Sequence, residues 1–215
     1  MAGPRGIADK VLWSGRVVAV QPRIRLTRSF DERSHSYLGY VLCIEGTCCG
    51  EAGEFLIAVG EAAHEKHRFQ VGMQLSGCSM QVGDPRKETA AFYKTSGLKV
   101  TKDALGETLA GPPFPSVPPD LETYRSRGHR RLDARTYDTK CTTCIWGCRM
   151  PVEMIIDRWN PSKKQYRFET FCYGPKSCAF YRPGPVRIVP GRKGMSYTEE
   201  DWVDEDATSH RGPDD

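Results

Sequence analysis

The spacing of the cysteines constrains this chain more than any other feature of its sequence. The stretch 141–148 reads CTTCIWGC, and Cys172 and Cys178 follow after a gap that contains one β-hairpin pattern. Structural Zn²⁺ takes four soft ligands at the corners of a tetrahedron, with Zn–S distances near ~2.3 Å, and a Cys-x2-Cys turn supplies two of them. We therefore expect four thiols to bind a structural zinc ion, namely Cys141, Cys144, Cys172 and Cys178.

Cys148 leaves an alternative open, because it adds a fifth thiol to the same segment. Cys141, Cys144 and Cys148, joined by Cys172 or Cys178, are the ligand set of an alternative iron–sulfur cluster. The spacing departs from that of ferredoxins, which favours zinc. Under zinc binding, Cys148 is expected to be a buried spare thiol.

Composition limits the class and the compartment of the protein. The chain has 215 residues, 39% of them hydrophobic, and a mean hydropathy of -0.53. No apolar run approaches the roughly 20 residues that span a bilayer, and the first residues lack the apolar segment of an export signal. Nine cysteines, an odd number, favour metal ligands and reduced thiols over a disulfide framework. We expect a cytoplasmic protein with no membrane contact.

Charge is distributed unevenly along the chain. Residues 199–215 hold eight acidic residues and one arginine, whereas residues 1–198 hold 30 basic and 19 acidic residues, a net charge of +11. A body with this charge favours polyanionic partners, nucleic acid first among them. The acidic tail is expected to be disordered, and either to occupy the basic surface or to recruit a basic protein partner.

Residues 11–102 read as a string of β-strands, so the fold is expected to be mainly β. Five strand patterns occur, with a short helix pattern after the third and with Gly15 inside a long first strand. This is the order of a five-stranded OB-fold barrel, in which a glycine lets one strand coil sharply enough to serve both sheets. A different small antiparallel barrel or sandwich is the alternative.

The second half of the chain begins with a change in composition. Residues 103–140 contain five prolines within 112–119 and five arginines between positions 125 and 135, which predicts a semi-rigid linker and then a basic segment. Residues 141–190 follow a cysteine, hairpin, cysteine order with turn chemistry at Asn160 and Pro161. We expect a metal-binding hairpin module there, followed by the acidic tail.

Recognisable catalytic motifs are absent from the sequence. There is no G-x-S-x-G, no phosphate-binding G-x-x-x-x-G-K-[ST] and no H-E-x-x-H. A zinc ion held by four thiolates has no open position for water and is structural. The sequence thus favours a binding protein over an enzyme.

Basic and aromatic residues in the strand patterns predict a face for nucleic acid, because single strands bind to basic grooves with aromatic stacking platforms. Arg23 and Arg25 share one face of the first strand, whereas Ile24 and Leu26 share the other, so the strand is expected to be basic outward. The candidate residues are Trp13, Arg16, Arg23, Arg25, Arg28, Tyr37, Tyr40, Tyr93, Lys94 and Lys99.

A barrel with Gly15 in its first strand, followed by CTTC at 141–144 and by Cys172 and Cys178, resembles the OB-fold plus zinc-ribbon architecture of replication protein A and related single-strand binders. The resemblance implies a structural zinc module beside a face for single-stranded DNA or RNA, without enzymatic activity. The order departs from that family, because the cysteines follow the barrel after a proline linker and the second pair is more widely spaced.

Two other classes remain open. Acyl-thioester-associated OB-fold proteins are similar in pairing a ribbon with a barrel, but their ribbon comes first. An iron–sulfur redox or scaffold protein is the third class, because the spacing in 141–148 admits a cluster.

Overall fold

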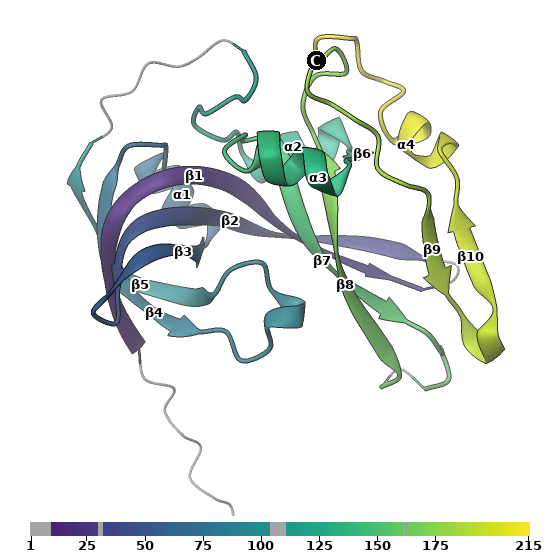
Figure 1. Ribbon diagram of the computed structural model, residues 1–215, viewed down its shortest axis with the longest axis horizontal. Coiled ribbons are helices and arrows are strands. Elements are labelled where there is room, and N and C mark those ends of the chain that lie inside the picture. Colours follow the sequence, from purple (N-terminus) through teal and green to yellow (C-terminus); the bar gives the residue numbers. More distant parts are fainter. Residues whose placement is uncertain (1–9, 30–31, 104–110, 161) are drawn as a thin grey trace, which may run out of the picture.

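One long strand, β1 (Lys10–Arg28), organises the fold of this mainly β protein (Figure 1). The computed structural model describes residues 10–29, 32–103, 111–160 and 162–215. The other strands are β2 (Arg33–Cys48), β3 (Glu51–Val59), β4 (Gln74–Gln81), β5 (Phe92–Lys102), β6 (Arg130–Arg131), β7 (Gly147–Ile155), β8 (Lys164–Cys172), β9 (Arg187–Pro190) and β10 (Ser196–Glu199). The helices are α1 (Glu61–His67), α2 (Leu121–Arg127), α3 (Ala134–Thr136) and α4 (Trp202–Ala207), with the short helical turns η1 (Pro85–Lys87), η2 (Tyr137–Cys141) and η3 (Arg192–Gly194).

Strands β1 to β5 close into a ring. β1 pairs antiparallel with β2 and with β4, β2 pairs with β3, and β4 pairs with β5. A parallel contact between β3 and β5, where Ile57 faces Phe92, completes the circle. The five strands and the short helix α1 after the third strand occur in the order that the sequence pattern predicts.

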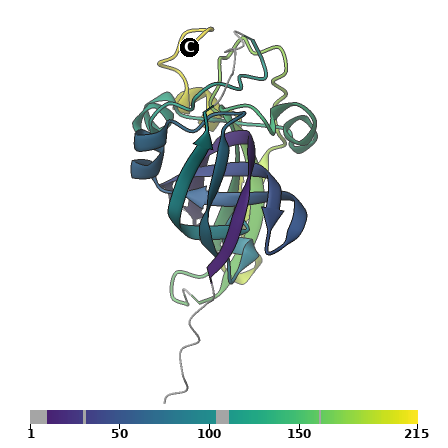
Figure 2. The same ribbon diagram turned by 90° about the vertical axis from the view of Figure 1, so that its left-hand side faces the viewer.

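Two glycines let β1 and β2 cross closely enough to close this ring. A Cβ atom on Gly15 would lie 2.5 Å from the carbonyl oxygen of Glu45, and one on Gly46 would lie 2.1 Å from that of Ser14. Both distances are far below any real contact, so only glycine fits at this crossing. The bend of β1 is visible in Figure 2.

The core of the ring follows the alternation of β1. Ile24 and Leu26 point inward and are each 1% exposed, whereas Arg23 and Arg25 point outward, as expected. Burying one large aliphatic side chain contributes roughly 1.5–3 kcal/mol to folding. A run of such positions on one face therefore fixes which side of the strand faces the core.

The cysteine hairpin is joined to the same sheet. The C-terminal end of β1, at Leu26–Arg28, pairs in parallel with Val152–Met154 of β7, and β8 and β6 follow in order. The hairpin thus extends from the ring as a continuation of one eight-stranded sheet (Figure 1). Sequence reasoning treated residues 141–190 as a separate module, and this continuous sheet was not foreseen.

The proline-rich segment packs onto the ring. Tyr40 donates a hydrogen bond of 2.7 Å from its hydroxyl to the carbonyl oxygen of Pro119, and Nε2 of buried His64 donates one of 3.0 Å to that of Pro118. The hydroxyl of Tyr124 on α2 donates to the carbonyl oxygen of Ile145 at 2.7 Å. The described part of the expected linker is therefore a strap between the ring and the hairpin.

The acidic tail is ordered, which corrects the expectation of disorder. Glu199 on β10 accepts hydrogen bonds from Arg28 at 2.6 Å and from Arg33 at 2.8 Å, and both Glu199 and Arg28 are buried. A carboxylate that is buried with two guanidinium partners holds its segment in place. The pKa of Glu199 is lowered because Arg28 and Arg33 outweigh the effect of burial.

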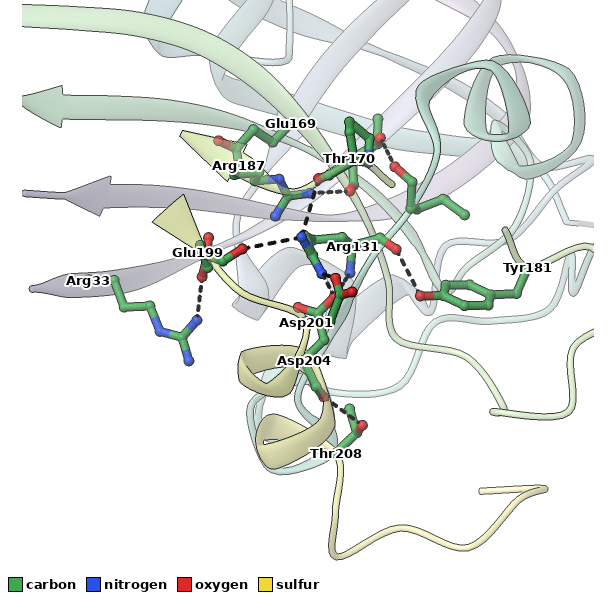
Figure 3. A network of polar contacts seen from close by, with 12 residues as sticks. Arg33, Arg131, Glu169, Thr170, Tyr181, Arg187, Glu199, Asp201, Asp204 and Thr208 are labelled. Carbon is green, nitrogen blue, oxygen red and sulfur yellow. Dashed lines mark hydrogen bonds and ion pairs between the residues drawn. The ribbon is translucent and has the colours of Figure 1, made fainter. Parts of the chain in front are cut away.

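Arg131 on β6 anchors the rest of the tail (Figure 3). Its Nε and backbone N–H both donate to Asp204 on α4, at 3.0 and 2.7 Å, and its guanidinium also pairs with Asp201. Tyr181 donates its hydroxyl proton to the carbonyl oxygen of Arg131 at 2.9 Å. The segment from β10 to α4 therefore covers the outer strand of the hairpin sheet.

Among the described residues, no helix is long and apolar enough to cross a membrane.

Candidate metal centre and aromatic platform

The first cysteine pair forms a tight turn. The backbone N–H of Cys144 donates to the carbonyl oxygen of Cys141 at 3.1 Å, and that of Gly147 donates to the carbonyl oxygen of Cys144 at 3.1 Å. A Cβ atom on Gly147 would lie 2.6 Å from the carbonyl oxygen of Cys141, so the turn requires glycine there. This knuckle, residues 141–147, is therefore specified locally.

A glutamine of the ring holds the knuckle in place. Nε2 of Gln21 on β1 donates to the carbonyl oxygens of Cys141 and Cys144, at 2.8 and 3.0 Å. Oε1 of the same side chain accepts a hydrogen bond of 2.6 Å from the hydroxyl of Tyr137. One amide group thus ties the ring, the knuckle and the η2 turn together.

The second cysteine pair comes from the far end of the hairpin. Cys172 is the last residue of β8 and lies opposite Gly147 in the antiparallel register of β7 and β8. Cys178 sits in the next turn, where its N–H donates to the carbonyl oxygen of Pro175 at 3.2 Å. The hairpin register therefore brings the second pair to the end of the sheet that carries the knuckle.

All four expected zinc ligands line one small cavity, of about 10 Å³. This is roughly the space of a single water-sized sphere. Its wall is otherwise largely aromatic, with Phe114, Trp146, Phe180 and Tyr181. Cys148 lies elsewhere: it is fully buried in the ring's core and its thiol donates to the carbonyl oxygen of Pro22 at 3.4 Å.

Burial raises the pKa of three of these thiols, those of Cys141, Cys144 and Cys172. The pKa of Cys141 rises to about 12, through burial and then through the neighbouring thiols of Cys144, Cys172 and Cys178. Burial also raises the pKa of Cys144, although backbone N–H groups at Phe114, Trp146 and Gly147 act in the opposite direction. These three thiols are neutral at pH 7 unless a cation replaces their protons. Within the described residues, no three or more His, Cys, Asp or Glu side chains are already arranged to hold a metal ion.

Three arginines surround the second cysteine pair. Nε of Arg127 donates to the carbonyl oxygen of Tyr173 at 2.8 Å, Arg130 donates to Pro175 at 2.8 Å, and Arg211 donates to Gly174 at 2.6 Å. Each guanidinium interacts electrostatically with the thiol of Cys172.

These arginines are only partly satisfied. In the described part of the chain, Nη2 of Arg127, Nε of Arg130, and Nε and Nη1 of Arg211 are buried without a hydrogen-bond partner. Buried donors without partners carry a cost of about 1–3 kcal/mol each. Guanidinium donors with unused hydrogen-bonding capacity therefore lie around the second cysteine pair, where they would stabilise thiolates.

The ten expected nucleic-acid residues do not form one surface. Trp13, Arg28 and Tyr40 are buried, at 3, 4 and 1% exposure, where no base can stack on them. Trp13 donates from Nε1 to Ser79 at 2.9 Å, and Arg28 is held by Glu199. These three residues are structural, which corrects the expectation that they bind a ligand.

The outward arginines of β1 are largely neutralised. Arg23 forms a two-point ion pair with buried Glu88, Arg25 lies 3.9 Å from the same carboxylate, and Arg16 pairs with Glu45 at 2.9 Å. These guanidinium groups are thus less available to phosphates than their outward positions suggest.

The remaining candidates are dispersed. Tyr37 lies under the guanidinium of Arg125, at 5.0 Å, and Lys94 lies 5.2 Å from the ring of Tyr93. Lys99 is exposed on β5.

A group of aromatic and basic residues that sequence reasoning missed lies on the hairpin. Tyr166 and Phe168 are two positions apart on β8 and so share one face, about 7 Å apart along the strand. The guanidinium of Arg149 lies 4.8 Å from the centre of the Phe168 ring, and Arg86 and Lys87 lie 4.9 and 5.3 Å from that of Tyr166. We call these five residues the aromatic platform. In the sequence, only the alternation in QYRFETF indicates this group of residues, because the cations come from a strand and a loop that are distant in sequence.

The platform borders a large cavity, of about 620 Å³. Strands β1 to β3 form one wall, and Thr142 and Thr143 of the knuckle and Tyr137 form another, while Arg149 and Phe168 close one side. This volume is typical of small-molecule sites.

Comparison with protein-family models, with curated proteins and with solved structures finds no match to this chain. What the site does must therefore be argued from its own geometry.

Proposed function

We propose that Cys141, Cys144, Cys172 and Cys178 bind one structural Zn²⁺. The shared cavity supports this, because its size suits a single ion and not a multi-iron cluster, and because Cys148 lies in the core of the ring. A zinc ion there would require the four sulfurs to close around one point, at Zn–S distances near ~2.3 Å. The partly satisfied arginines would offset the negative charge of the thiolates.

Metal content and colour test this assignment. We expect the purified protein to be colourless and to carry one zinc ion, without the visible absorption near ~400 nm of an iron–sulfur cluster. Cys178→Ser should lose the ion, whereas Cys148→Ser should retain it, because that thiol lies in the ring's core. A protein that binds zinc equally well with and without Cys178 would exclude the four-thiolate site.

We propose further that the ring of β1 to β5 is an OB-fold-like barrel and that the hairpin is a ribbon built onto it. The cyclic order β1-β2-β3-β5-β4, the helix between β3 and β4 and the glycine crossing support the barrel. Because β7 continues the sheet of β1, the ribbon would have a fixed orientation toward the barrel.

On this framework we infer that the protein binds single-stranded nucleic acid. The single observation that carries this is the aromatic platform, in which two rings on one strand face each have cationic side chains over them. A base that stacks on such a ring, with about 1–3 kcal/mol, would displace the cation from it, and the displaced cation would contact a phosphate. Net charge supports the proposal less than the sequence suggests, because many arginines are buried in internal pairs.

Anisotropy of a fluorescein-labelled 13-nucleotide strand tests the proposal, with DNA and RNA versions measured in parallel. Phe168→Ala should weaken binding about tenfold, and the double variant with Tyr166→Ala should weaken it further. The matched control is Trp202→Ala, because Trp202 is an aromatic residue that is 60% exposed on α4. Arg86 and Lys87 already pair with Asp84, so Arg149 is the cation most available to a phosphate, and one to three phosphate contacts predict a slope between about -0.7 and about -2 for log K against log salt. Equal losses in the control and platform variants would contradict a role for the platform.

A further inference from the structure

The large cavity beside the platform has an unusual set of charges. Three carboxylates line it, those of Glu54 on β3, Glu88 after η1 and Asp138 in η2, against the single cation Arg149. The carboxylate of Glu88 already has partners, because it pairs with Arg23 and accepts hydrogen bonds from the backbone N–H groups of the next two residues. Glu54 and Asp138 remain available: within the described residues, neither side chain forms an ion pair or a hydrogen bond, and both are exposed.

The rest of the cavity is suited to a flat ring. Its barrel wall consists largely of small and apolar side chains such as Val18, Ala19, Val41 and Leu56. Phe168 lines the same cavity as the two carboxylates, so a base that stacks on its ring enters the space that they border. The guanidinium of Arg149 lies 4.8 Å from the centre of that ring, and a base that stacks there would displace it toward the phosphate of the same nucleotide.

Ionised carboxylates only accept hydrogen bonds, and this selects among the bases. Guanine presents two adjacent donors on its Watson–Crick edge, N1–H and the N2 amino group, which match the two oxygens of one carboxylate. Adenine and cytosine each place a ring-nitrogen acceptor beside their amino group, and thymine and uracil flank one N–H with carbonyl oxygens. For these bases a carboxylate meets an acceptor and is repelled.

We propose that this cavity is a guanine-selective subsite, in which Glu54 and Asp138 read the donor edge of a base that stacks on Phe168. The inference rests on the proposed binding of single strands and adds a base preference to it. A well-made two-point contact discriminates against other bases by about tenfold or more.

Oligonucleotides that differ at one position test the subsite. Labelled 13-nucleotide thymine strands carry guanine, adenine, cytosine, thymine or hypoxanthine at the centre, and binding is measured by anisotropy with the full-length, zinc-loaded protein. We expect the guanine strand to bind about tenfold more tightly than the thymine strand. The strand with hypoxanthine should bind more weakly than the guanine strand, because hypoxanthine differs from guanine only in lacking the N2 amino group.

The variants are Glu54→Gln, Asp138→Asn and the double variant, with Glu51→Gln on the same strand as the matched control, since Glu51 is exposed outside the cavity. The double variant should bind the guanine and thymine strands equally while its affinity for the all-thymine strand stays within about twofold of the wild type. The single variants assign the contribution of each carboxylate.

The failures of the two proposals are distinguishable. If the wild type binds the all-thymine strand but gains nothing from guanine, or if the double variant keeps the preference, the guanine subsite is excluded and strand binding stands. If no strand binds at low salt, the proposed function itself fails. A preference that extends equally to hypoxanthine would also exclude reading of the N2 amino group by a carboxylate.

Discussion

Gln21, in the middle of the longest strand, donates a hydrogen bond of 2.8 Å from Nε2 to the carbonyl oxygen of Cys141, 120 positions away in the sequence. The same nitrogen also donates to Cys144. The ring of strands and the knuckle are thus connected through the backbone of both cysteines, without using their thiols. This leaves the sulfurs of Cys141 and Cys144 for a ligand.

Gln21→Ala should therefore weaken the proposed metal site without touching a ligand. The variant removes the side-chain donor of two carbonyl oxygens, each of which keeps its backbone N–H partner, and leaves the hydroxyl of Tyr137 without its acceptor, a loss of about 1–3 kcal/mol. We expect a lower urea midpoint and faster loss of zinc to a competing chelator. Gln81→Ala, at an exposed position of β4, is the control. Unchanged chelator kinetics in Gln21→Ala would show that the clamp does not support the site.

Asp204→Asn tests whether the acidic tail is part of the folded structure. The substitution removes the charge that faces Arg131, whose side chain is only 3% exposed. An uncompensated buried charge costs about 3–5 kcal/mol, so we expect a loss toward the lower end because Asp201 remains. Urea unfolding measures this loss, and Asp206→Asn on the exposed side of α4 should leave the midpoint unchanged. A tail that merely shields the surface would give equal midpoints for the two variants.

The local part of the candidate site was predictable from the sequence. A Cys-x2-Cys turn needs only neighbouring residues, and a hairpin register returns Cys172 opposite Gly147. Strand alternation could also have identified Arg28 as buried, because it shares the parity of Ile24 and Leu26 along β1. Because arginine is charged, Arg28 was expected to lie on the surface and to bind nucleic acid.

The aromatic platform and the charge balance were not predictable in the same way. Phe168 and Arg149 come from different strands, and their contact depends on the register of β7 and β8. Net charge was a poor guide because it does not show which charges neutralise one another. Arg28 and Arg131 are both paired with acidic residues of the tail, and those pairs became visible only in three dimensions.

A buried histidine, His129, and a half-buried one, His35, predict that the fold is sensitive to mild acid. His35 and His129 pack against each other with ring centres 4.8 Å apart. Burial, followed by Arg33 and Arg28, lowers the pKa of His35 to about 4, although Glu199 opposes this effect. The pKa of His129 is also lowered well below its ordinary value, first by burial and then by His35 and neighbouring arginines.

Both histidines are neutral in the folded protein, whereas the unfolded chain takes up protons below a pH of about 6.5. Stability is therefore complete above this pH and falls as the pH decreases toward the folded pKa values. Between pH 7.5 and pH 5 we expect a loss of about 2 kcal/mol from His35 in urea unfolding, to which His129 adds a loss of its own. His129→Phe keeps an aromatic ring beside Phe171 and should make this loss smaller. An identical pH dependence in this variant would remove His129 from the explanation.

If the four cysteines bind zinc as proposed, its removal should loosen the hairpin end while the ring of β1 to β5 persists, because these strands close their ring without the cysteine segment. Without zinc, neutral thiols no longer hold the knuckle against the end of β8, so the amide protons of Gly147 and Tyr173, which bond to Cys144 and Trp146, should exchange faster. Hydrogen exchange before and after treatment with a strong chelator measures this, with amides of β1 and β2 as the internal reference. Added Zn²⁺ should restore protection and Mg²⁺ should not, because Mg²⁺ prefers oxygen ligands. If amide exchange instead accelerates equally in the ring of strands and in the hairpin, the ion stabilises the whole sheet. If exchange changes in neither place, a metal at these thiols is excluded.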